Sequence, residues 1–228
     1  IANSNFTKEL ATKVGINKSK IHVIFPGIPK PKNLDNTSID EAKKTFGNSF
    51  PKIITVARLD KRKGHDKILM VIKNLKTKYP KIKYISVGFG DEESNLKKLI
   101  KELSLEKEVL LLKDIEENFK LGLISESDLF LMPTRKEKKS VEGFGISFVE
   151  AASYGTPSIG GSYGGAADAI SHNKTGLICD GEDLNSIYES VINILTNEKF
   201  TELGKEALNF SENFHWNKVV KNYLKLIN

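Results

Sequence analysis

An alternation of short apolar runs with amphipathic segments decides the fold, and it begins at Ile53-Ile54-Thr55-Val56-Ala57, followed by Arg58-Leu59-Asp60-Lys61-Arg62-Lys63-Gly64. The first five residues form an apolar run of strand length, and a helix is expected to start near His65. Similar apolar runs follow at Ile82 to Val87, Val109 to Leu112, Asp128 to Met132, Pro157 to Gly160 and Gly176 to Cys179. Between most of them, apolar residues recur at helical spacing. This alternation predicts a doubly wound α/β fold, with a parallel sheet covered by helices on both faces.

The first 29 residues stand apart from this pattern. They contain a helix candidate at Thr7 to Val14 and a strand candidate at Ile21 to Phe25, which runs into the turn Pro26-Gly27-Ile28-Pro29. The chain starts at Ile1 without a methionine, so we expect that upstream residues are missing. We interpret residues 1–29 as the end of a preceding N-terminal domain or a linker region.

Residues 30–228 are predicted to form the main domain. An irregular polar stretch at Lys30 to Ser38 comes first, followed by a short helix candidate at Asp40 to Phe46. Two helix candidates, Lys199 to Asn209 and His215 to Ile227, close the domain.

Composition is that of an ordinary globular protein, with 228 residues, 39% hydrophobic residues and a formal net charge of +6. Aromatic and basic residues do not interleave, so no nucleic acid partner is predicted. The basic charge favours anionic ligands and allows contact with an anionic membrane surface. The single Cys179 excludes an internal disulfide and fits a reducing compartment. With no apolar run of about 20 residues and no signal segment, we expect a cytoplasmic protein with possible contact at the inner face of the membrane.

Two carboxylates flank a glycine-containing turn in the stretch Glu142-Gly143-Phe144-Gly145-Ile146-Ser147-Phe148-Val149-Glu150. The glycines allow close approach of the backbone, and the amides from Phe144 to Ile146 are expected to be unpaired at the start of a helix, where an anion fits. Glu142 lies in the turn and Glu150 further along the helix. The two carboxylates are therefore expected to reach different ends of one ligand rather than each other.

Loops at the ends of other predicted strands add basic residues and glycines. Arg58 and Lys63 follow the first strand and are expected to neutralise a diphosphate without a metal ion, whereas Lys61 and Arg62 are interpreted as solvated. Close ligand approach is also expected at Gly88 and at the glycine-rich loop from Gly160 to Gly165. The four histidines are dispersed, so neither a metal site nor a cofactor is predicted.

Several short motifs occur in a fixed order: Arg58-Leu59, Lys63-Gly64, Val87-Gly88-Phe89-Gly90, Pro133-Thr134, Glu142-Gly143-Phe144-Gly145, Glu150-Ala151, Gly155-Thr156-Pro157, Gly164-Gly165 and Thr175-Gly176-Leu177. In these motifs the chain resembles the C-terminal, nucleotide-sugar-binding domain of a GT-B glycosyltransferase of family four. The resemblance covers nearly the whole chain and implies a Rossmann-like domain that forms one half of a GT-B fold.

The resemblance also implies roles for individual residues. Arg58 and Lys63 would bind the diphosphate, and Glu142 would face the donor sugar. The amides from Gly143 to Ile146, those of Phe144 and Gly145 included, would hold phosphate and sugar, and Glu150 would bind the ribose hydroxyls. Three positions depart from the common pattern of the family: Pro29 where Asp is frequent, Lys113 where Gly is frequent near the base, and Asp168 where Glu is usual.

The implied function is the donor-binding half of a retaining glycosyltransferase of the hexosyltransferase type, acting in polysaccharide biosynthesis. It would move a sugar from a nucleoside-diphosphate sugar to a glycan or lipid-linked acceptor, which an upstream half would bind, so this chain alone is expected to be inactive. Two alternatives stay open: a non-catalytic nucleotide-binding partner subunit of the same fold, and a GT-B sugar-nucleotide epimerase. The sequence leaves the sugar, base, acceptor, linkage and oligomeric state undetermined.

Overall fold

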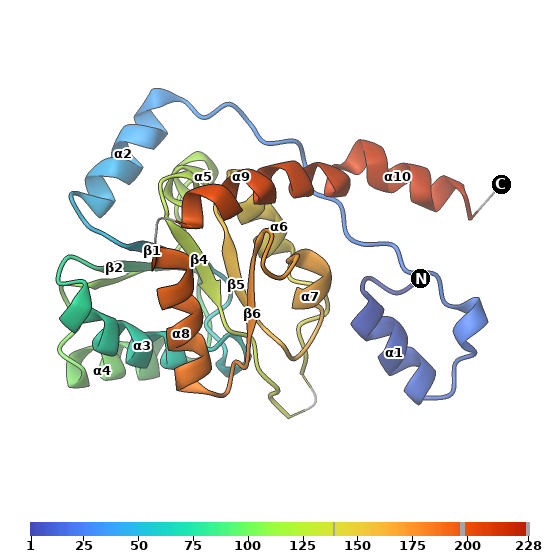
Figure 1. The fold of residues 1–228 in the computed structure, drawn as a ribbon, viewed down its shortest axis with the longest axis horizontal. Coiled ribbons are helices and arrows are strands. Elements are labelled where there is room, and N and C mark those ends of the chain that lie inside the picture. Colours follow the sequence, from blue (N-terminus) through green and yellow to red (C-terminus); the bar gives the residue numbers. More distant parts are fainter. Residues whose placement is uncertain (139, 197–198, 227–228) are drawn as a thin grey trace.

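The chain folds around one six-stranded parallel sheet with the strand order β3-β2-β1-β4-β5-β6. We describe it from a computed structural model that covers residues 1–138, 140–196 and 199–226 (Figure 1). The strands are β1 Lys52–Val56, β2 Lys83–Val87, β3 Val109–Leu112, β4 Leu129–Met132, β5 Ser158–Gly161 and β6 Gly176–Cys179. All six predicted strands are confirmed, with ends that differ by at most one residue.

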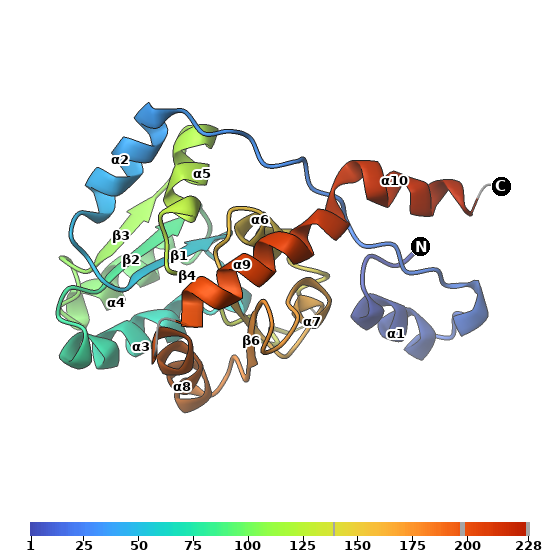
Figure 2. The same ribbon diagram turned by 45° about the horizontal axis from the view of Figure 1, so that its top comes forward.

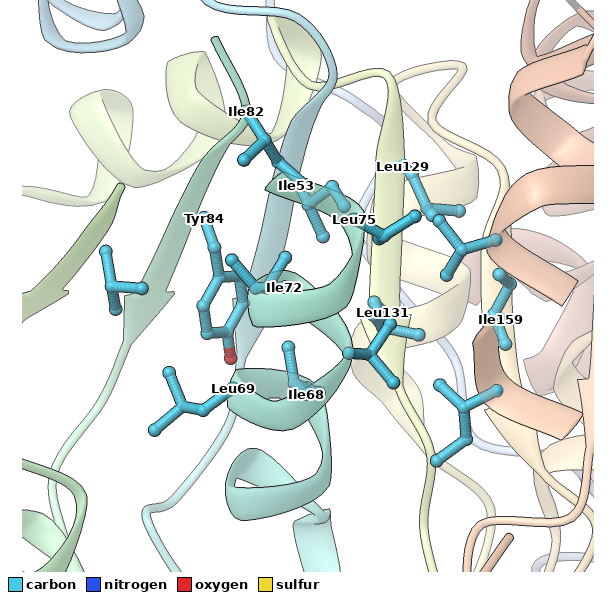
Figure 3. Close-up of a cluster of buried hydrophobic side chains, with 14 of the residues drawn as sticks. Ile53, Ile68, Leu69, Ile72, Leu75, Ile82, Tyr84, Leu129, Leu131 and Ile159 are labelled. Atoms are coloured by element: carbon cyan, nitrogen blue, oxygen red, sulfur yellow. The ribbon is translucent and has the colours of Figure 1, made fainter. Parts of the chain in front are cut away.

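Side chains alternate along each strand between two separate hydrophobic cores. Ile53 of β1 faces the first core, with α3 (His65–Lys78), α4 (Glu93–Glu102) and α8 (Leu184–Leu195). Figure 3 shows this core, where Ile68, Ile72 and Leu75 of α3 pack over the sheet. Ile54 faces the second core, with α2 (Asn36–Phe46), α5 (Glu117–Ser125), α6 (Ile146–Ala152) and α7 (Ala166–Ala169). The sheet is thus covered on both faces, as predicted.

The direction of winding reverses between β1 and β4, which are neighbours in the sheet. After β1 the chain builds β2 and β3 on one side, and from β4 onward it builds the other side. In sheets of this type the loops after the two strands at the reversal diverge and leave a crevice beyond their carboxyl ends. The segments after Val56 and after Met132 therefore border the place where a ligand site is expected.

Two helices were not predicted from the sequence, and one begins earlier than predicted. The missed helices are α5 and the short α7. Helix α2 begins at Asn36 because the side chain of Asp35 accepts a hydrogen bond from the Ser38 amide at 2.7 Å, so the irregular stretch is shorter than Lys30 to Ser38.

The N-terminal segment lies to one side of the sheet in both views (Figures 1 and 2). Helix α1 (Asn5–Lys13) confirms the first helix candidate, but the predicted strand at Ile21 to Phe25 is wrong. Only Val23 forms a bridge, to Ala2, because no neighbouring strand among the described residues supplies a longer ladder. Asp168 ties this segment to the domain, since its two carboxylate oxygens accept from the Asn5 amide at 2.7 Å and the Asn5 side chain at 2.6 Å.

The two closing helices are α9 (Lys199–Ser211) and α10 (Trp216–Leu224), and Ile227 lies outside the described residues. The turn before the main domain pairs with the start of α10: the Ile28 amide donates to the Phe214 carbonyl at 2.8 Å, and the Trp216 amide donates to the Ile28 carbonyl at 3.1 Å. Within the described ranges, none of the helices combines the length and the apolar character that crossing a membrane requires.

Candidate functional site

Three charged side chains meet beside the reversal of the sheet. Lys63 and Arg62 come from a 3-10 turn, Lys61–Lys63, that follows β1, and Glu142 comes from the segment between β4 and α6. Lys63 Nζ lies 2.5 Å and Arg62 Nη1 2.8 Å from the same oxygen, Glu142 Oε2. The long loop after β4 therefore returns to the turn after β1, and a single carboxylate oxygen receives both cations.

All three side chains are nearly buried, with 9% of Arg62, 11% of Lys63 and 12% of Glu142 exposed. The interpretation of Arg62 as a solvated residue is therefore wrong. The turn directs Arg62 as well as Lys63 inward, and the partner of Arg62 lies 80 residues away in the sequence. No local pattern distinguishes Arg62 from Lys61, which is exposed.

An open pocket of about 350 Å³ lies next to this cluster. Lys63 and Glu142 line it, together with Asn3, Pro26, Val56, Ala57, Gly143, Phe144, Gly145, Ile146 and Ser147. Arg62 is not among the lining residues, although it binds the same carboxylate oxygen as Lys63. The pocket thus presents one cation, one carboxylate and the glycine-containing turn.

Arg58 lies at the edge of the site, with 70% of its side chain exposed. Its guanidinium is 3.2 Å from Asp60 Oδ2, and the same oxygen is 3.6 Å from Arg62. Charges of alternating sign therefore run from Arg58 through Asp60 and Arg62 to Glu142. The exposed Arg58 would have to leave Asp60 to reach a ligand, whereas Arg62 has a carboxylate on each side.

In the turn before α6, backbone groups rather than the aromatic side chain are available to a ligand. Phe144 is buried, and its ring lies 5.5 Å from the Phe25 ring and 5.7 Å from the Phe214 ring. Among the described residues, the amides of Gly143, Phe144 and Gly145 donate no hydrogen bond to a protein acceptor. Gly145 has φ +90°, a conformation that favours glycine. A ligand in the pocket can therefore meet unpaired amides, but not the Phe144 ring.

The glycine-rich loop supports this turn and does not itself line the pocket. A Cβ at Gly165 would lie 2.2 Å from the Gly143 carbonyl oxygen, and one at Gly164 would lie 2.7 Å from that of Glu142. The Gly165 amide also donates to the Glu142 carbonyl at 2.8 Å. These two glycines therefore allow two backbone segments to touch, and close ligand approach at the loop stays a prediction.

Gly88 also allows two backbone segments to come close together. It has φ +149°, and a Cβ there would lie 2.0 Å from the Ala57 carbonyl oxygen. The glycine thus lets the end of β2 pack against the backbone that leads into Arg58. The structure gives Gly88 a contact within the protein, and its role in binding a substrate stays a prediction.

Glu150 lies in a second pocket of about 190 Å³ between α5, α6 and the linker. Its lining residues are Gly27, Ile28, Pro29, Lys30, Pro31, Lys32, Glu117, Leu121, Ile146, Glu150, Ser153 and Tyr154. Ile146, with 49% of its surface exposed, lines this pocket as well as the first. The two carboxylates therefore face different pockets that share one residue.

The partner of Glu150 is Lys120 of α5. Lys120 Nζ lies 3.2 Å from Glu150 Oε1 and 2.9 Å from Glu117 Oε1. Burial lowers the pKa of Lys120, but its hydrogen bonds and ion pairs with the two carboxylates outweigh burial, and the net shift is upward. Lys120 was not identified from the sequence, where nothing relates it to a residue 30 positions away.

A buried histidine supports the first basic loop. His65 Nε2 lies 3.2 Å from the Arg58 carbonyl oxygen, to which it can only donate, and Nδ1 lies 3.1 Å from the Tyr84 hydroxyl. Burial lowers the pKa of His65 to about 4, although the hydrogen bond to Arg58 opposes this shift. A neutral imidazole therefore fixes the carbonyl of Arg58.

Two of the positions that depart from the family pattern have partners within the protein. Lys113 lies 3.7 Å from Glu93, and Asp168 holds the N-terminal segment through Asn5. Pro29 lines the second pocket. In the part of the chain that the structure describes, no three His, Cys, Asp or Glu side chains gather closely enough to hold a metal ion.

Comparison with known proteins gives both sequence relatives and structural neighbours. The chain is 31% identical over 147 residues to a GDP-mannose-dependent alpha-(1-6)-phosphatidylinositol monomannoside mannosyltransferase of Mycobacterium tuberculosis, covering 64% of this chain and 38% of that protein. It is 30% identical over 233 residues to an uncharacterized 41.2 kDa protein in the cps region of Klebsiella pneumoniae, covering 99% of this chain and 60% of that protein. The chain thus spans about 40–60% of the length of these relatives.

The fold matches solved glycosyltransferase structures. HepE of Anabaena, crystallised with UDP-glucose, superposes with a TM-score of 0.84 at 19% identity, covering 99% of this chain and 62% of HepE. The family model described as "Glycosyl transferases group 1" matches residues 36–214, which is more than half of the chain. The chain therefore belongs to the group 1 family of glycosyl transferases, and its six-stranded parallel sheet is that of GT-B glycosyltransferase structures.

Proposed function

We propose that this chain is the donor-binding half of a retaining glycosyltransferase that uses a nucleoside-diphosphate sugar. The observation that carries the proposal is the pairing of Lys63 with Glu142 beside unpaired turn amides, in a pocket between the carboxyl end of β1 and the turn before α6. A cation and free amides suit a diphosphate, and a carboxylate next to them suits the hydroxyls of a sugar.

The diphosphate would lie against Lys63 and the amides of Gly143 to Gly145. Lys63 would leave Glu142 Oε2 for a phosphate oxygen, and the exposed Arg58 would turn in from the edge of the site. Both side chains carry fixed positive charge near the phosphate oxygens, where negative charge develops as the bond to the sugar breaks. These residues would therefore stabilise the leaving group without a metal ion.

The sugar and the nucleoside would lie at opposite ends of the diphosphate. Glu142 would accept hydrogen bonds from the donor sugar, and Glu150 would accept them from the ribose hydroxyls in the second pocket. Ile146 lines both pockets, so one ligand that spans them would pass over its exposed side chain. One carboxylate lies in the turn and the other within helix α6, and these positions fit a ligand that spans both pockets.

In the proposed reaction an acceptor hydroxyl attacks the sugar from the face that the diphosphate leaves. The bond between the sugar and the phosphate oxygen breaks, a bond to the acceptor oxygen forms, and the hydroxyl proton passes to the departing diphosphate. The acceptor, a glycan or a lipid-linked sugar, would be held by a part of the protein outside this chain. Relatives that use GDP-mannose and a neighbour crystallised with UDP-glucose support a nucleotide-sugar donor.

A thermal-shift screen tests this proposal. We expect UDP, GDP or ADP to raise the melting temperature of the chain, and CMP, which lacks a diphosphate, to raise it less. A ligand at about 100 times its dissociation constant stabilises a fold by about 2.7 kcal/mol. We also expect the chain alone to transfer no sugar. No shift with any diphosphate, or transfer by the chain alone, would contradict the proposal.

A further inference from the structure

Glu142 forms ion pairs with two cations, although only Lys63 takes part in its proposed role in the pocket. Arg62 and Lys63 both bind its Oε2 oxygen, at 2.8 and 2.5 Å. Lys63 faces the pocket, whereas Arg62 does not line it. The two cations therefore differ in their surroundings: Lys63 can meet a ligand in the pocket, whereas the charged partners of Arg62 are Glu142 and Asp60.

The proposed function requires Lys63 to change partners. When Lys63 moves to a diphosphate, Glu142 loses a counter-charge while its side chain remains only 12% exposed. A nearly buried carboxylate without a cation is strongly unfavourable, so Glu142 would hold Lys63 back from the ligand. A second, permanent cation on the same oxygen removes this difficulty.

We propose that Arg62 is a positioning residue that gives Glu142 a lasting counter-charge and holds it in place, so that Lys63 is free to bind the diphosphate. This inference rests on the proposed function of the same site. Arg62 would act through Glu142 and Lys63 and would not touch the ligand.

The surroundings of Arg62 fit a fixed residue. Its guanidinium lies between Glu142 and Asp60, whose Oδ2 is 3.6 Å away. Its carbonyl accepts a hydrogen bond from the Arg135 amide at 3.0 Å, which joins the turn after β1 to the end of β4. A guanidinium keeps its positive charge, so Arg62 can remain the counter-charge of Glu142 whichever partner Lys63 has.

The test compares four variants by calorimetry with inorganic pyrophosphate, UDP and GDP as probes. Arg62→Met removes the proposed counter-charge, and Lys61→Met is the matched control, since it removes one positive charge from an exposed side chain of the same turn. Glu142→Gln removes the carboxylate that competes for Lys63. The double variant Arg62→Met with Glu142→Gln separates an indirect role of Arg62 from a direct one.

In the Glu142 background, we expect Arg62→Met to weaken pyrophosphate and diphosphate binding about tenfold, the size of one charge-assisted contact, and Lys61→Met to change it little. In the Glu142→Gln background, Arg62→Met should no longer weaken binding, because Lys63 has no carboxylate to return to. Glu142→Gln alone should bind pyrophosphate at least as tightly as the unmodified chain.

Three results would overturn the inference: an equal loss from Arg62→Met in both backgrounds, equal effects of Arg62→Met and Lys61→Met, or a clear loss of pyrophosphate binding in Glu142→Gln. The last measurement keeps the test decisive if Arg62→Met does not fold. If the unmodified chain binds none of the three probes, the proposed function fails instead.

Discussion

At the scale of single residues, the site depends on which carboxylate each cation meets. Lys63 binds the nearly buried Glu142, the exposed Arg58 binds Asp60, and Lys120 binds Glu150, which lines the second pocket. In each case a ligand would either compete with the carboxylate for the cation or bind to the carboxylate itself. Substitutions at these positions should therefore change the preference for particular parts of a nucleotide.

The cations should discriminate between a diphosphate and a bare nucleoside. We expect Lys63→Ala and Arg58→Ala each to weaken diphosphate binding by about 1.5–3 kcal/mol, because each removes a charge-assisted contact, and to leave nucleoside binding nearly unchanged. Calorimetry with the diphosphate and the nucleoside measures both. Equal losses for the two ligands would mean that these residues act through folding or general charge.

Glu150 should make binding selective for a ribonucleotide over its 2′-deoxy analogue. We expect Glu150→Ala to weaken ribonucleotide binding by about 1.5–3 kcal/mol and to affect the 2′-deoxy analogue less, because only the former presents both hydroxyls. Lys120→Met, which leaves Glu150 without its partner at 3.2 Å, should reduce the same preference for ribose. Titration of both nucleotides into each variant is the test, and an equal loss for both nucleotides would place the ribose elsewhere.

His65 should make the fold sensitive to acid. Its pKa is lowered to about 4 in the folded chain, below the ordinary value of 6.5, so its neutral form contributes stability that is present above pH 6.5 and lost as the pH falls to about 4. We expect His65→Gln to lose less stability than the unmodified chain over this range, as measured by urea unfolding. The exposed His22→Gln is the control, and a His65→Gln profile parallel to that of the control would refute this account of His65.

At the scale of elements, backbone contacts between loops hold the site together. Gly164 and Gly165 press against the carbonyls of Glu142 and Gly143, and Gly88 presses against that of Ala57. These contacts join the turn before α6 and the loop after β1 to neighbouring parts of the sheet. The geometry of the pocket therefore depends on residues that do not line it.

Gly165→Ala should disturb the pocket from outside. Its φ of −84° is ordinary, so the penalty comes from close contacts of the new Cβ, with the Gly143 carbonyl oxygen at 2.2 Å and with Phe144 Cα at 2.8 Å. Overpacking of this kind costs about 1–3 kcal/mol. We expect weaker binding of a nucleoside diphosphate by calorimetry, whereas Gly15→Ala, with no atom within 4 Å of its Cβ, should leave binding unchanged. Unchanged binding in Gly165→Ala would show that the turn tolerates displacement.

Helices and strands could be predicted where a local sequence pattern indicates them, but contacts between distant residues could not. Each strand is a short apolar run, so all six strands were confirmed. Helix α5 was missed because Leu121 to Ile124 are all buried and form no helical stripe. The strand at Ile21 to Phe25 was wrong because a strand also needs a partner, and only Ala2 is present. The Arg62 pair with Glu142 joins residues 80 positions apart, which no local pattern reveals.

At the scale of the whole molecule, we propose that the chain provides one face of a site. It spans about 40–60% of the length of its sequence relatives, and α1 and α10 extend from one side of the sheet (Figures 1 and 2). The order of strands and helices along the chain predicted the doubly wound sheet, and the family match confirmed the resemblance to GT-B glycosyltransferases. The division into residues 1–29 and 30–228 stays a prediction, as do the roles of the site residues.

The most direct test of the central claim is a crystal structure of this chain with the nucleoside diphosphate that stabilises it most. The account predicts a diphosphate within ion-pair distance of Lys63 and beside the amides of Gly143 to Gly145. It also predicts that Glu150 is bonded to the ribose hydroxyls and Arg62 remains on Glu142. A nucleotide bound elsewhere, or one bound while Lys63 stays on Glu142 and makes no contact with phosphate, would contradict it.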